Sequence, residues 1–270
     1  MARHGRHFGW RPDQPDPHDY YYGAPPAKLR ALPASTDLRG QMPPVYDQGR
    51  IGSCTANAIG AAIQFDRKKA TEAPDFVPSR LFIYYNERSI ENDVPYDKGA
   101  QIRDGIKSIV KQGVCPESEW PYDDTPADPN TQLWPAGAKP TQQPPAKCFS
   151  NAKAYEAVTY LRITSTLDQL RGCLAEGYPF VFGIKVYESF FDPQGQAQTT
   201  IPMPSAVDLT QQPEGHAILA VGYDDARNVF VCRNSWGPGV QDKGYFYMPY
   251  AYVTSPSLSS DFWTIRRILS

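Results

Sequence analysis

One cysteine and one histidine, far apart in the sequence, have the surroundings that a nucleophile and its base require. Cys54 follows the turn 48–53 and stands where an apolar helical pattern begins. The positive end of a helix dipole lowers the pKa of a thiol, and a neighbouring imidazolium lowers it further. His216 is the only histidine after residue 18, so histidine chemistry in the body of the chain falls to this side chain. The pair predicts nucleophilic catalysis by a thiolate.

Two further polar side chains are placed to assist this chemistry. The amide of Gln48 and the backbone N–H of Cys54 flank a glycine-bearing turn, and a tetrahedral oxyanion requires two such converging donors. His216 lies nine residues before Asp225 and Asn234 nine after it. A hairpin centred on Asp225 places the histidine and the asparagine opposite each other. Asn234 would then fix the imidazole tautomer and leave the other ring nitrogen for Cys54.

Each of these residues alone favours a structural interpretation. A free cysteine is most often a small buried hydrophobe, and a single histidine on an apolar strand is usually a hydrogen-bonded core residue. Gln48 alone is a loop residue, and Trp236 alone is a core residue. Unrelated core residues have no reason to occur together in this order, so the joint occurrence favours catalysis.

Three strings of residues resemble the signatures of papain-like cysteine peptidases. They are Q-G-x-x-G-S-C at 48–54, G-H-A-I-L-A-V-G-Y at 215–223 and N-S-W-G at 234–237. Leu32-Pro33, the stretch 113–122 and Gly244-Tyr245 also match this family's pattern, so the resemblance covers about residues 32–250. The chain is similar in particular to a bacterial member with a short N-terminal arm.

The resemblance implies a role for each matching residue. Four are expected to be catalytic, as oxyanion-hole amide, nucleophile, general acid and base, and orienter of the base: Gln48, Cys54, His216 and Asn234. Four are expected to bind substrate or shield the site: Ser53, Gly99, Gly215 and Trp236. The chain departs from the family pattern at Ile51, where a disulfide cysteine is usual, at Thr55, and at Val240-Gln241, where a second tryptophan-glycine is usual.

The elements that must position these residues follow from hydrophobic periodicity. Apolar residues at helical spacing predict helices over 53–69, 103–111 and 167–176. Apolar runs predict strands over 179–186, 216–223, 229–234 and 244–248. The predicted helices precede the predicted strands along the chain, and this segregation indicates an α+β protein. The resemblance implies the papain-like two-lobed fold, with a helical left lobe, an antiparallel β-barrel-like right lobe and the active site in the cleft between them.

Composition excludes several other functions. The 270 residues carry a formal net charge of −2 without long runs of either sign, which argues against nucleic acid or a membrane surface as a partner. No apolar stretch predicts a signal peptide or a membrane span, so the chain is expected to be cytoplasmic or exported by a non-classical route. None of the five cysteines forms a C-x-x-C pair, and neither a metal nor another cofactor is expected. Cys115 and Cys148 are either buried thiols or a disulfide.

Two segments of the chain are rich in proline. Five of its 27 prolines lie in residues 1–31, which are predicted to form an extended N-terminal arm and a possible propeptide, and residues 32–270 are predicted to form the peptidase domain. Eight more lie between Pro116 and Pro145, where regular structure is not expected.

The prediction for function is a cysteine endopeptidase that hydrolyses peptides or proteins through a thioester acyl-enzyme. The arm is expected to cover the groove and inhibit in cis, which would make the chain a zymogen. Two alternatives stay open. One is a catalytically silent papain-like binding or scaffold protein, and the other is an amidase or acyl transferase that uses the same triad.

Overall fold

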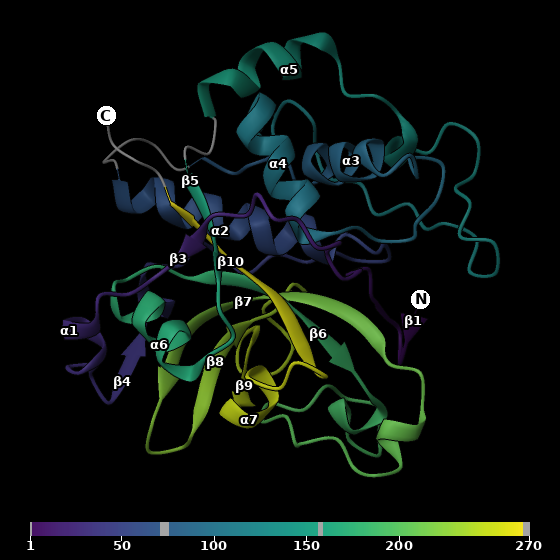
Figure 1. Ribbon diagram of the computed structural model, residues 1–270. Helices are drawn as coiled ribbons and strands as arrows, with labels where there is room; N and C mark the ends of the chain where they lie inside the picture. Colours follow the sequence, from purple (N-terminus) through teal and green to yellow (C-terminus); the bar gives the residue numbers. More distant parts are fainter. Residues whose placement is uncertain (1, 71–75, 156–158, 267–270) are drawn as a thin grey trace.

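The computed structural model describes residues 2–70, 76–155 and 159–266, and it has a mainly helical part and a part built on a sheet that also carries short helices (Figure 1). Helix α2 (Cys54–Ala70) lies between the two parts and packs against α3 (Arg80–Ile90), α4 (Ile102–Gln112) and strand β7 (Glu214–Asp224). Every residue of α2 from Cys54 to Asp66 is buried. A helix covered on all sides is a central element of a core, so the first residue of α2 has a fixed position.

The predicted helices are confirmed, and one long helix was missed. The expected runs 53–69, 103–111 and 167–176 correspond to α2, α4 and α6 (Leu167–Ala175), and α4 stops before Gly113, whose φ of 75° few other residues adopt. Helix α3 was not predicted, although Ser79 caps it by accepting a hydrogen bond from the Phe82 N–H at 3.1 Å. Helix α5 (Ala146–Ala152) begins directly after the proline-rich segment.

One eight-stranded sheet forms the other part of the molecule. Its strands follow the order β3-β5-β10-β6-β7-β8-β9, with β4 paired to β7, and every pairing except β3 with β5 is antiparallel. Their bounds are β3 (Tyr21–Tyr22), β4 (Ser35–Asp37), β5 (Thr159–Ile163), β6 (Phe180–Val186), β8 (Val229–Arg233), β9 (Tyr245–Pro249) and β10 (Ser259–Arg266). The four predicted strands are present as β6 to β9, whereas β5 and β10 were not predicted. Helix α7 (Tyr250–Val253) lies between β9 and β10.

The hairpin of β7 and β8 has a register different from the predicted one. Its turn spans residues 225–228, and a register shift then leaves Leu219 opposite Arg233. Asn234 therefore lies one residue beyond β8 and is not the cross-strand neighbour of His216. The prediction that a symmetric hairpin about Asp225 places the two residues opposite each other is wrong, because the turn is centred later and β7 contains a bulge.

From residue 2 onward, the segment 1–31 runs along the boundary between the helical part and the sheet, as the purple trace of Figure 1 shows. It includes the short pair β1 (Ala2–Arg3) and β2 (Arg6–His7), strand β3 and the one-turn helix α1 (Pro26–Leu29), so it is not extended throughout. Trp10 forms a parallel bridge with Ala100, just before α4. We call residues 1–31 the arm.

The proline-rich segment between Pro116 and Pro145 is held by a buried arginine of the helical part. The guanidinium of Arg88 donates to the backbone oxygens of Tyr84 at 3.1 Å, Val94 at 2.7 Å and Pro140 at 2.6 Å. The segment contains a 3-10 turn over residues 139–141 but no α-helix or strand among its described residues, close to expectation. No described helix is long and apolar enough to cross a membrane.

Candidate active site

Cys54 is the first residue of α2 and is fully buried. Its Sγ accepts a hydrogen bond from the backbone N–H of Ala217 on β7 at 3.3 Å. Burial raises the pKa of the Cys54 thiol to about 12, although the N–H groups of Ala217 and of Gly9 in the arm act in the opposite direction. With the arm in place, the thiol is therefore protonated.

His216 lies on β7 next to the residue that contacts the thiol. Its Nε2 is 2.9 Å from Oδ1 of Asn234, and within the described part of the chain its buried Nδ1 has no hydrogen-bond partner. Burial lowers the pKa of His216 to about 4, and the contact with Asn234 raises it in part. The ring is thus neutral near pH 7. Its Nε2 carries the proton and donates it to Oδ1 of Asn234, and its Nδ1 carries no proton. The described contacts do not include a direct hydrogen bond between His216 and Cys54.

Aromatic side chains exclude water from the His216–Asn234 contact. Trp236 stacks on the imidazole with ring centroids 4.8 Å apart and an interplanar angle of 24°. Phe190 meets Trp236 edge-on at 6.0 Å, and Phe191 stacks on it at 6.4 Å. The position of Trp236 suits the shielding role that the resemblance implies.

Gln48 connects the turn before α2 to the residues after β8. Its Nε2 donates to the carbonyl of Ile51 and to the carbonyl of His7 in the arm, both at 3.1 Å. Its Oε1 accepts from the hydroxyl of Ser235 at 2.6 Å, and the N–H of Ser235 donates to Asn234 Oδ1 at 2.8 Å. Ser235 therefore orients two amides at once, a function that the sequence reasoning missed although Ser235 lies inside the N-S-W-G string.

The remaining predicted residues lie around the same point. The hydroxyl of Ser53 is 2.5 Å from that of Tyr122, and the carbonyl of Gly215 accepts from the N–H groups of Gly9 and Trp10, both at 3.0 Å. Gly99 lies against the arm, where an added Cβ would be 1.8 Å from the Gly9 oxygen. The backbone groups that pair with the arm belong to its neighbour Ala100, whose N–H donates to Gly9 at 2.7 Å and whose carbonyl accepts from Arg11 at 3.0 Å.

The arm fills the space above these residues at close range. A Cβ added to Gly9 would lie 1.7 Å from the oxygen of Gly52, and one added to Gly183 would lie 1.9 Å from the Trp10 ring. Phe8 contacts the His216 ring edge-on at a centroid distance of 5.6 Å. The arm thus approaches both lobes at the level of the thiol.

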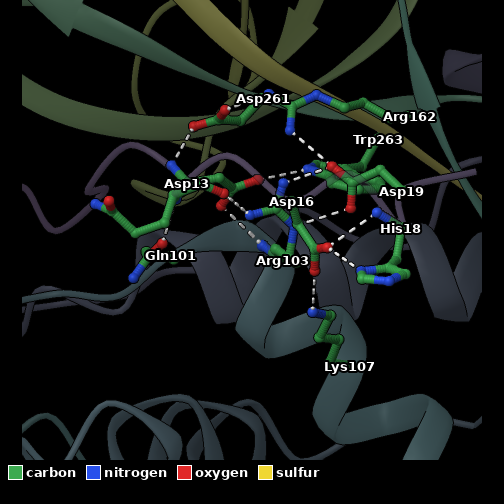
Figure 2. A network of polar contacts seen from close by, with 11 residues as sticks. Asp13, Asp16, His18, Asp19, Gln101, Arg103, Lys107, Arg162, Asp261 and Trp263 are labelled. Carbon is green, nitrogen blue, oxygen red and sulfur yellow. Dashed lines mark hydrogen bonds and ion pairs between the residues drawn. The ribbon is translucent and has the colours of Figure 1, made fainter. Parts of the chain in front are cut away.

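A cluster of charges holds the next stretch of the arm, as Figure 2 shows. Asp19 pairs with Arg103 at 2.5 Å and with Arg162 at 2.9 Å, and Arg162 also pairs with Asp261 at 3.1 Å. Asp261 accepts from the N–H of Asp13 at 2.8 Å, and Asp13 accepts from the N–H of Arg103 at 3.1 Å. We call these five residues the arm anchor. Three carboxyl groups share two guanidinium groups, which leaves one carboxyl group without a cation.

Burial and the neighbouring carboxylate act on the carboxyl group of Asp13 in the same direction. Together they raise its pKa to about 7, against the hydrogen bonds from Arg103 and Trp263. The pKa of Asp261 is also raised, mainly by burial. Asp13 is therefore protonated below about pH 7, which balances the excess of carboxyl groups in the arm anchor.

Comparisons with known proteins agree with one another. The model of papain family cysteine proteases matches residues 32–259. The sequence is 41% identical over 230 residues to an uncharacterized peptidase C1-like protein of Acanthamoeba polyphaga mimivirus, covering 82% of this chain and 69% of that protein.

Two solved structures are also similar. The crystal structure of xylellain, a cysteine protease from Xylella fastidiosa, is 48% identical, with a TM-score of 0.93 over 100% of this chain and 99% of that chain. A cysteine protease of Carica candamarcensis, solved in complex with E-64, is 19% identical, with a TM-score of 0.62 over 88% of this chain and 100% of that chain. The second likeness concerns the fold alone.

Proposed function

Because this chain belongs to the papain family of cysteine proteases and is a cysteine-type peptidase with the papain-like fold, we propose that it is an endopeptidase with a Cys54–His216–Asn234 triad. The observation that carries the proposal is the hydrogen bond of 2.9 Å that joins His216 to Asn234 beside the thiol at the start of α2. A buried thiol that served only packing would need neither a base nor an orienter.

The reaction follows from these positions. Once the arm leaves, water reaches the site, and the Cys54 proton moves to Nδ1 of His216, the ring nitrogen without a partner. The thiolate forms a C–S bond to the peptide carbonyl, and the oxyanion accepts hydrogen bonds from Gln48 Nε2 and the Cys54 N–H. The C–N bond then breaks while His216 protonates the leaving amine. Water, deprotonated by His216, attacks the thioester and releases the acid and the free thiol.

Gln48 supports the oxyanion role because its amide already holds a carbonyl oxygen. Its Nε2 donates to the carbonyl of His7, a peptide oxygen of the arm, at 3.1 Å. A substrate carbonyl would take the same place after the arm has left. Removal of one oxyanion-hole donor typically slows turnover by about 100- to 1,000-fold.

We further propose that the arm inhibits in cis and that the chain is a zymogen in which residues 32–270 are the peptidase domain. Three observations support this. The Gly9 N–H acts on the Cys54 sulfur, the His7 carbonyl occupies the Gln48 amide, and the carbonyl of Gly215 is taken by two arm amides. Peptide or protein substrates need the same groups, so they bind only when the arm is displaced.

A cysteine-to-serine substitution tests the nucleophile. Cys54→Ser is expected to abolish turnover of an aminoacyl-arylamide, whereas Cys148→Ser, at a buried thiol outside the site, is expected to keep it. Turnover by Cys54→Ser at the level of the unmodified chain would contradict the proposal. Product analysis with and without an added amine distinguishes hydrolysis from acyl transfer by the same triad.

A chain that starts at Leu32 tests the arm. We expect it to react with a thiol-directed epoxide faster than the full chain, because the groove is open. Equal rates would mean that the arm does not control access to Cys54.

A further inference from the structure

The amide of Asn234 has a second partner besides His216. Its Nδ2 donates to Oε1 of Gln241 at 2.8 Å, and Nε2 of Gln241 donates to the backbone carbonyl of Gln198 at 2.9 Å. Gln241 is thus fixed at both ends of its side-chain amide. It contacts neither Cys54 nor the His216 ring among the hydrogen bonds of the described residues.

The donor and acceptor roles in these two hydrogen bonds are fixed, because the first acceptor is a backbone carbonyl. A backbone carbonyl only accepts, so the oxygen of Gln198 orients the NH₂ group of Gln241 toward itself and its Oε1 toward Asn234. Oε1 also only accepts, so it holds the NH₂ group of Asn234, while the Ser235 N–H donates to Oδ1 at 2.8 Å. Together they turn Oδ1 toward His216. An acceptor at Oδ1 then requires the proton on Nε2 of His216. Nδ1 remains bare, and it is the nitrogen that must accept the thiol proton.

The backbone conformation of Gln241 is strained, which supports a functional role for these hydrogen bonds. Gln241 has a φ of 57°, a left-handed conformation that costs energy for a residue with a side chain. The turn is closed by the Gly244 N–H, which donates to Val240 at 2.7 Å. Gln198 is fastened in turn, because its Nε2 donates to the carbonyl of Ser189 at 2.8 Å. The backbone turn at Gln241 and its hydrogen-bond partner Gln198 are therefore both fixed by neighbouring contacts.

We propose that Gln241 is a positioning residue that, together with the Ser235 N–H, sets the orientation of the Asn234 amide and, through it, the Nε2–H tautomer of His216. The proposal rests on the proposed function, since it assigns to Gln241 a task within the Cys54–His216–Asn234 triad. Without the Oε1 acceptor, only the Ser235 N–H, which donates to Oδ1 at 2.8 Å, still opposes a turn of the Asn234 amide by 180° that would present its NH₂ group to Nε2. His216 would then carry its proton on Nδ1 and could not accept one from Cys54.

Three variants of the full chain separate polarity from packing. Gln241→Met keeps the length of the side chain and removes its polar atoms. Gln241→Glu keeps an acceptor for the Asn234 NH₂ group and removes the donor to the Gln198 carbonyl. Lys243→Met is the matched control, because Lys243 is exposed in the same turn and has a similar φ of 55°.

The first readout is the nitrogen NMR spectrum of the histidine rings at pH 7, with His216→Ala for assignment. We expect the Nε2–H tautomer of His216 in the unmodified chain, in Gln241→Glu and in Lys243→Met. In Gln241→Met the tautomer ratio is expected to shift toward Nδ1–H by about tenfold, the worth of one hydrogen bond. An unchanged His216 spectrum in a folded Gln241→Met chain would overturn the proposal.

The second readout is the steady-state hydrolysis of an arylamide. Gln241→Met is expected to lower kcat, by up to about tenfold, with KM unchanged, and to move the alkaline limb of the pH profile to lower pH. Gln241→Glu is expected to restore most of the rate. In an Asn234→Ala background, Gln241→Met should cause no further loss, and a full additional tenfold loss there would contradict a role through Asn234.

The same Asn234→Ala chain separates this proposal from the proposed function. If its His216 tautomer and its kcat equal those of the unmodified chain, Asn234 is not the orienter and the proposed triad fails. If Asn234→Ala is impaired and Gln241→Met is not, only the role of Gln241 fails.

Discussion

Substitution of Asp13 by asparagine should change how the docking of the arm depends on pH. Asp13 has a pKa of about 7 in the docked arm and an ordinary value of 3.8 when the arm is free. Docking therefore takes up a proton between these pH values. Its stabilising effect is fully present below pH 3.8 and is lost as pH rises through about 7.

The size of the effect follows from the two pKa values. From pH 5 to pH 8 the proton linked to Asp13 weakens docking by about 90-fold, or about 2.6 kcal/mol, with each full pH unit worth about 1.4 kcal/mol. An asparagine has no such proton. The ratio of docking constants between the unmodified arm and the Asp13→Asn arm should therefore fall by about 90-fold over this range.

The ratio is needed because other groups titrate when the arm docks. Burial lowers the pKa of His7, so docking releases a proton from this residue as Asp13 takes one up. The same contribution from His7 is present in both chains and cancels in the ratio. The pKa of Arg103, which faces Asp13, is raised by Asp19 and Asp13, so this group does not titrate in the same range.

Hydrogen exchange of the Ala100 amide is a direct assay, because this N–H donates to Gly9 at 2.7 Å only while the arm is docked. Both chains carry Cys54→Ala to prevent cleavage, and rates are corrected for intrinsic exchange at each pH. Asp16→Asn is the control: hydrogen bonds from Lys107 and His18 hold the pKa of Asp16 below its usual range, so its ratio stays constant from pH 5 to pH 8. A constant ratio for Asp13→Asn as well would refute the reasoning.

Three further predictions concern the arm, the helical part and the thiols. Gly9→Ala places a Cβ 1.7 Å from the Gly52 oxygen. Overpacking costs about 1–3 kcal/mol and weakens docking of the arm, so basal arylamide turnover of the full chain should rise roughly tenfold. An unchanged rate would contradict a covering arm. Arg88→Ala leaves three backbone carbonyls without their donor and should lower the free energy of unfolding by about 3 kcal/mol in urea titration, whereas a loss below about 0.5 kcal/mol would contradict this anchor. Cys115 and Cys148 are both free thiols, so alkylation of the denatured chain without reductant should label five cysteines, and three labels would indicate a disulfide.

Local signals were sufficient for the elements that carry the predicted triad. The apolar pattern after Ser53 predicted α2, and the apolar runs around His216 and Asn234 predicted β7 and β8. The register of that hairpin was not predictable from symmetric spacing, because a bulge in β7 and a later turn move every pairing. The side chain of Asn234 still reaches His216 from beyond the end of its strand.

Long-range contacts account for most of what the sequence did not predict. Strand β10 is recognised only by its pairing with β5 on one side and β6 on the other, segments about 75–100 residues away in the chain. Helix α3 is different, because the cap at Ser79 was a local signal that went unused. Gln241 looked like a mere departure from the family pattern, and its partners Asn234 and Gln198 became visible only in the fold.

The central claim is that Cys54 is the one nucleophile among five cysteines, and covalent labelling tests it most directly. The full chain and the chain starting at Leu32 are treated with a peptidyl epoxide, and the labelled residue is identified by peptide mass mapping. We predict a single label on Cys54 in both chains, formed faster in the shorter one and accompanied by loss of peptidase activity. Loss of activity with the label on any other cysteine, or with Cys54 unmodified, would contradict the account.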